Sequence, residues 1–100
     1  MLLYNVTIKI DTEIADEWSA WMKNSHIPDV LATGLFTDSR LCRILGDDNP
    51  DGITFAAQYH CPSVEHFQRY QKEFAPALQA QTQQKYGGRF AAFRTVMEIL

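Results

Sequence analysis

The chain has 100 residues, of which 46% are hydrophobic and 21% charged, so its composition is that of one globular domain and not of a disordered segment. The formal net charge of −3 argues against nucleic acid or an anionic membrane as a partner, because both need a basic patch. No apolar run reaches membrane-spanning length and the N-terminus lacks signal-peptide features, so we expect a cytoplasmic protein.

The first element is predicted to be a strand over residues 2–10, because hydrophobic side chains occupy every second position. A helix should follow, with Trp18 and Met22 in its apolar stripe. Residues 24–29 should interrupt this helix, because a residue that precedes proline, here Ile27, is pushed away from helical angles. A short second turn of helix is expected over residues 28–33.

Two strands joined by a tight connection are predicted next. The first covers residues 36–45, and its alternation is too poor to assign an inner face. Residues 46–52 carry turn chemistry, with the hairpin reversing near Asp48 and Asn49. The second strand covers residues 53–60. The two cysteines of the chain do not suggest a disulfide framework, and we expect reduced thiols.

A second long helix is expected to begin after Ser63, whose hydroxyl suits a helix N-cap. Pro76 should break or kink it near Phe74, and the glycine pair at 87–88 should end it. A last strand is predicted over residues 90–100. Its helix-facing residues are assigned as Ala91, Phe93, Met97 and Ile99.

The order βαββαβ predicts an α+β fold of the ferredoxin-like class. The whole chain, residues 1–100, should form one domain with a four-stranded antiparallel sheet and two helices on one face. The topology implies the strand order 4-1-3-2. The predicted core between sheet and helices is Val6, Ile8, Trp18, Met22, Phe55, Phe67, Phe74, Phe93 and Met97.

This arrangement leaves the second face of the sheet without a covering layer. On the assignments above, that face is a mixture of polar residues with Leu3, Phe90 and Val96, and it also carries Arg94. It is either an ordinary solvent-exposed face or the surface on which two copies stack and enclose a polar-lined cavity. We predict the second arrangement, a homodimer formed through the open sheet faces.

The layout resembles the dimeric α+β barrel superfamily, which includes small monooxygenases, YciI-like proteins and chlorite-dismutase relatives. More closely, the run from Trp18 through His26 and Pro28 to Gly34, with the C-terminal segment 93–100, resembles an uncharacterised bacterial family, domain-of-unknown-function family 4286. The likeness spans nearly the whole chain. It implies a ferredoxin-like fold and dimers, and it supplies no established activity.

Four residues are candidates for binding a small ligand: His26, Gln58, His60 and Arg94. His26 stands where a helix breaks and is either an acid/base group or a cap for backbone carbonyls. Arg94 interrupts a largely apolar strand and either binds an anionic ligand or pairs with a carboxylate of a second copy. No spacing of histidine and cysteine fits a metal site, and we expect neither a metal nor a cofactor.

Two functions fit these residues. The first is a dimeric module that binds a small acidic or aromatic metabolite. The alternative is a cofactor-free enzyme of the small monooxygenase or YciI-like type with a histidine as acid/base group. RNA binding on the open sheet face is not expected, because Asn5, Thr7, Gln58 and His60 stand where aromatic side chains would be needed.

Overall fold

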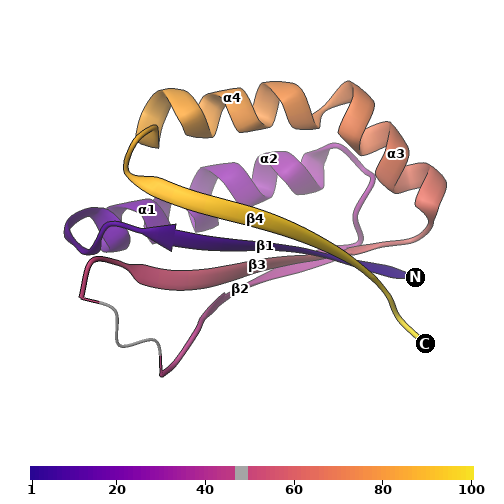
Figure 1. Ribbon diagram of the computed structural model, residues 1–100. Helices are drawn as coiled ribbons and strands as arrows, with labels where there is room; N and C mark the ends of the chain where they lie inside the picture. The colour runs from indigo at the N-terminus through magenta and orange to yellow at the C-terminus, as the bar shows by residue number, and fades with distance from the viewer. Residues whose placement is uncertain (47–49) are drawn as a thin grey trace.

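Four antiparallel strands form the single sheet of the computed structural model, which describes residues 1–46 and 50–100. The strands are β1 (Leu2–Ile10), β2 (Asp38–Arg43), β3 (Ile53–Cys61) and β4 (Phe90–Glu98), in the order β2-β3-β1-β4. Figure 1 shows all the helices on one face of this sheet. The predicted α+β class, strand order and ferredoxin-like architecture are confirmed. The turn predicted near Asp48 and Asn49 lies outside the described residues.

The first helical segment is continuous, which corrects the predicted interruption at residues 24–29. A 3₁₀ turn (η1, Thr12–Ile14) leads into α1 (Ala15–Trp21), a π-helical turn (η2, Met22–His26) and α2 (Ile27–Ala32). Ile27 keeps helical angles, with φ −61° and ψ −45°. Pro28 has no N–H to donate, and its ring crowds the carbonyl one turn earlier. The wider π turn immediately before the proline accommodates it without ending the helix.

The second helical segment is divided as the sequence indicates. Helix α3 (Val64–Glu73) begins at Ser63, whose hydroxyl accepts a hydrogen bond from the backbone N–H of His66. Phe74, with φ −121° and ψ −39°, separates α3 from α4 (Ala75–Tyr86). Because a proline near a helix start needs no hydrogen-bond partner for its nitrogen, Pro76 stands in the first turn of α4. No helix among the described residues is long and apolar enough to cross a membrane.

The face of β4 was assigned wrongly from the sequence. In the antiparallel register of β1 and β4, Val6 lies opposite Arg94 and Ile8 opposite Ala92. Residues paired in this way point to the same side of a sheet, and Ile8 and the other even-numbered residues of β1 face the helices. Arg94 therefore faces the helical layer, and the odd-numbered residues of β4 face the open side.

Two predicted core residues consequently lie on the open face. Phe93 and Met97 are 63% and 40% exposed, whereas Phe67 in the helical layer is buried. Ile8, Trp18 and Met22 are also buried as predicted, and Val6, Phe55 and Phe74 are partly buried. The misassignment arose because both faces of β4 carry apolar residues, so its alternation does not distinguish them.

The register also settles the inner face of β2, which the sequence left open. Leu41 pairs with Ala57 and Ser39 with Tyr59, so these β2 residues face the helices. Asp38, opposite His60, belongs to the open face. The hydrophobic core thus lies between one face of the sheet and the helical segments, and none of the described helices lies on the opposite face (Figure 1).

Candidate ligand pocket

A pocket lies inside the domain, between the inner face of the sheet and the helices. Strands β1, β3 and β4 and helices α1, α3 and α4 all contribute to its wall. The space open to the centre of a water molecule is about 50 Å³, enough for a few waters. Most of the wall is apolar, and its principal polar side chains are Tyr4, His26, Tyr59, Tyr70, Gln79 and Arg94.

His26 reaches this pocket from the end of the π-helical turn. Its ring stacks on Trp21, with centroids 5.1 Å apart and planes at 29°, and Trp21 in turn packs edge-on against Tyr86. The Nδ1 atom of His26 is buried and has no hydrogen-bond partner among the described residues. Burial lowers the pKa of His26 below its usual 6.5, and the positive charge of Arg94 acts in the same direction, whereas Asp29 opposes both. Free His26 is therefore a neutral imidazole at pH 7.

Arg94 enters the same pocket from the edge strand of the sheet. It projects from β4 on the helix-facing side, opposite Val6. Its guanidinium lies close enough to the Tyr4 hydroxyl to lower the pKa of that phenol, and its charge also acts on Tyr70 and His26. An arginine offers five N–H donors, so contact with one tyrosine leaves donors for an anionic ligand.

Three tyrosines line the pocket together with the arginine, and two of them, Tyr4 and Tyr70, lie within reach of its charge. Burial raises the pKa of Tyr4, Tyr59 and Tyr70 above its ordinary value of 10, and the hydroxyls influence one another through space. The charge of Arg94 lowers the pKa of Tyr4 and Tyr70 by a smaller amount than burial raises it. All three hydroxyls are consequently protonated at neutral pH. Tyr4 and Tyr70 are hydrogen-bond donors close to a positive charge, an arrangement that suits an anionic oxygen.

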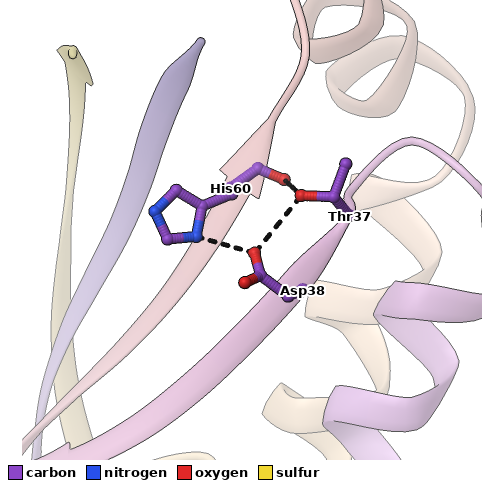
Figure 2. A network of polar contacts seen from close by, with 3 residues as sticks. All are labelled: Thr37, Asp38 and His60. Atoms are coloured by element: carbon purple, nitrogen blue, oxygen red, sulfur yellow. Dashed lines mark hydrogen bonds and ion pairs between the residues drawn. The ribbon is translucent and has the colours of Figure 1, made fainter.

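The other two predicted site residues do not reach the pocket. Gln58 and His60 lie on the open face of β3, opposite Asn5 and Leu3. His60 Nδ1 lies 2.7 Å from Asp38 Oδ1, and the Thr37 hydroxyl donates to the same oxygen at 3.2 Å. Figure 2 shows these three residues together. The network joins the start of β2 to the end of β3 on the side opposite the pocket.

The structure brings His26 and Arg94 together, but not where the sequence suggested. The predicted cavity lay at the open sheet face, whereas the pocket that both residues line is on the helix-facing side. The three tyrosines were predicted to be apolar packing residues and not site residues. A signal for them exists in the sequence, because a buried tyrosine, unlike phenylalanine, carries a hydroxyl that needs a polar neighbour.

The polar side chains that line the pocket are arginine, histidine, tyrosine, glutamine and threonine, and none of the described lining residues carries a carboxylate. Over residues 1–46 and 50–100, no group of three or more histidine, cysteine, aspartate or glutamate residues is placed to hold a metal ion. Both cysteines are free thiols, Cys42 exposed and Cys61 buried. The arrangement is therefore suited to hydrogen bonding of an anion and to proton transfer.

The fold and the pocket define a ferredoxin-like α+β protein with a largely apolar pocket between its sheet and its helices, into which an arginine, a histidine and tyrosines project. The family model described as "Domain of unknown function (DUF4286)" matches residues 1–100. The chain belongs to this family. No curated protein matches the sequence.

Several solved structures share the fold at low sequence identity. A mutant of MhuD, whose crystal structure has two manganese protoporphyrin IX molecules bound per active site, superposes with a TM-score of 0.73 and 17% identity. The comparison covers 100% of this chain and 95% of that one. HapK from Hahella chejuensis gives a TM-score of 0.73 at 14% identity, over 100% and 93% of the two chains.

A third structure is described as a dimeric ferredoxin-like protein from an uncultured marine organism. It gives a TM-score of 0.67 at 10% identity and covers 100% of this chain and 95% of its own. At such identities the likeness establishes the fold and nothing about activity.

Proposed function

We propose that this protein binds a small organic anion with an apolar or aromatic body in the pocket between its sheet and its helices. The observation that carries the proposal is the convergence of Arg94 with the hydroxyls of Tyr4 and Tyr70 inside an otherwise apolar wall. A guanidinium flanked by phenol donors favours a carboxylate or a phenolate. The apolar wall then accommodates the rest of the ligand.

The competing role for Arg94 was an ion pair across a dimer of stacked open faces. Its position opposite Val6 argues against that role, because it faces the helices and not the open side. No ion pair involving Arg94 occurs within residues 1–46 and 50–100, where the described salt bridges join other groups. A ligand anion would therefore supply the negative charge that balances this guanidinium.

The size of the pocket limits the ligand. The pocket as it stands has space for only a few waters. A single ring would fit if the exposed lining side chains, Gln79 and Arg94, moved aside. Aromatic acids with one ring are thus suitable probes. We choose 3-phenylpropanoate, with its uncharged amide as the matched compound.

Arg94→Gln is expected to weaken binding of 3-phenylpropanoate by about 10- to 100-fold, because a hydrogen bond to a charged group contributes about 1.5–3 kcal/mol. The dissociation constant is measured by following the indole N–H resonance of Trp18, which lines the pocket. The amide should bind weakly to both proteins. The melting temperature of the variant should stay near that of the original protein, since Arg94 belongs to an exposed edge strand.

Arg40→Gln is the matched control, because Arg40 lies opposite Gln58 on the open face of the sheet. It should leave the affinity unchanged. Equal affinities of the original protein for the acid and the amide would contradict the proposal. So would a dissociation constant for Arg94→Gln within twofold of the original.

We further propose that the protein is a homodimer through the open face of its sheet. Phe93 and Met97 leave apolar surface exposed there, on a face that none of the helices of residues 1–46 and 50–100 covers. The description of a structural neighbour as a dimeric ferredoxin-like protein supports this arrangement. Because a two-fold interface presents the same patch from both copies, each dimer would bury two Phe93 side chains, one from each copy.

A further inference from the structure

The histidine of the pocket has the properties of a general base. The His26 imidazole is held in place by stacking on Trp21, and its Nδ1 forms no hydrogen bond among the described residues. A neutral imidazole carries one nitrogen lone pair that can accept a proton. The charged groups near it are Asp29, on the same helix, and Arg94 across the pocket on β4. The neighbouring tyrosines on β1, β3 and α3 are uncharged at neutral pH.

The opposite side of the pocket can stabilise the negative charge that such a base creates. Removal of a proton from carbon next to a carbonyl moves an electron pair onto the carbonyl oxygen. An enolate oxygen in this pocket would meet the guanidinium of Arg94 and the phenol donors of Tyr4 and Tyr70. Trp18 adds a further donor, since its indole N–H is buried without a hydrogen-bond partner in the described part of the chain and its side chain also lines the pocket.

We propose that this pocket catalyses keto–enol tautomerisation of a 2-oxo acid with a small apolar or aromatic side chain, with His26 as the proton-transfer group. The proposal rests on the proposed anion-binding function. His26 accepts the proton from the carbon next to the carbonyl, the C–H electron pair forms the carbon–carbon double bond, and the carbonyl π pair moves to oxygen. The protonated His26 then returns the proton to that oxygen, so the step needs no oxidant, metal or second substrate.

Phenylpyruvate is the probe for this reaction, because it joins a carboxylate and an enolisable carbonyl to a single ring. The exchange of its C3 hydrogens with deuterium in D₂O is followed by proton NMR, with and without protein. The protein should accelerate the exchange above the buffer rate. His26→Gln should reduce the protein-dependent rate by about 100-fold or more, since a general base contributes about 10²–10⁴-fold.

The matched control is His66→Gln. His66 is exposed at the start of α3, where its backbone N–H is capped by Ser63, and it does not line the pocket. Its replacement should leave the exchange rate unchanged. In the original protein, the rate at low phenylpyruvate concentration should rise with pH and become half-maximal below pH 6.5, because burial lowers the pKa of His26.

Binding and exchange are measured on the same samples, so the two proposals can fail separately. If phenylpyruvate binds but exchanges at the buffer rate, the tautomerase inference is wrong and the binding function stands. If His26→Gln binds phenylpyruvate and keeps the accelerated exchange, another group is the base and the assignment to His26 is wrong. If neither phenylpyruvate nor 3-phenylpropanoate binds, the proposed function itself is wrong. Loss of exchange with retained binding in His26→Gln supports the inference.

Discussion

Replacement of Phe67 by alanine is expected to lower the free energy of unfolding by about 3–5 kcal/mol, the usual cost of truncating a buried phenylalanine. Phe67 is 7% exposed and packs against Tyr4, with ring centroids 5.0 Å apart. Its removal therefore leaves a cavity between α3 and the sheet. Domains of this size are commonly stable by about 5–15 kcal/mol, so the loss is a large fraction of the total.

Urea unfolding of the variant and the original protein measures this difference. Val64→Ala is the matched control on the same helix, because Val64 is 51% exposed and its truncation leaves no cavity. The control should change the unfolding free energy by less than about 0.5 kcal/mol, as most exposed substitutions do. The original protein and the two variants should be compared at equal concentration, because association adds to the apparent stability. A loss well below 1 kcal/mol for Phe67→Ala would place this ring outside the core.

Phe93→Asp is expected to dissociate the proposed homodimer. Truncation of a central aromatic residue commonly costs an interface about 2 kcal/mol or more. Each dimer would lose this contact twice, so we expect about 4 kcal/mol, or a dissociation constant raised about a thousandfold. The introduced carboxylates would also face each other across the interface. Sedimentation velocity at micromolar concentration should show a dimer for the original protein and a monomer for the variant.

Val96→Asp is the control on the same strand. Val96 lies opposite Tyr4 and therefore faces the helical side, while being 45% exposed. This substitution adds the same charge away from the open face and should leave the dimer intact. A monomeric original protein at micromolar concentration would contradict the dimer. Dissociation by both variants would indicate that the edge of β4, and not the open face, forms the contact.

The candidate site was predictable only in part. His26 attracts attention in the sequence because it stands before a proline at the end of an aromatic helix. His26 lies in a π-helical turn, through which the chain accommodates Pro28 within one continuous helix. A prediction made one residue at a time does not reveal such a turn. The three tyrosines that line the pocket with Arg94 come from three separate elements, β1, β3 and α3.

Local pattern was sufficient for the architecture of this protein. The alternation in β1, the capping serine before α3, the proline after Phe74 and the order of the elements depend on neighbours within a few residues. These features fix the conformation of each segment and, through the connection lengths, the strand order. The predictions made from these features were correct without knowledge of any long-range contact.

The position of Arg94 depended on tertiary structure. Side chains in a strand point alternately to the two faces of the sheet. If one residue is assigned to the wrong face, every other side chain of the strand is assigned to the wrong face as well. Both faces of β4 contain apolar residues, and its own sequence therefore does not distinguish them. Only the pairing of Val6 with Arg94, between residues almost ninety positions apart, directs the guanidinium into the pocket and leaves Phe93 on the open face.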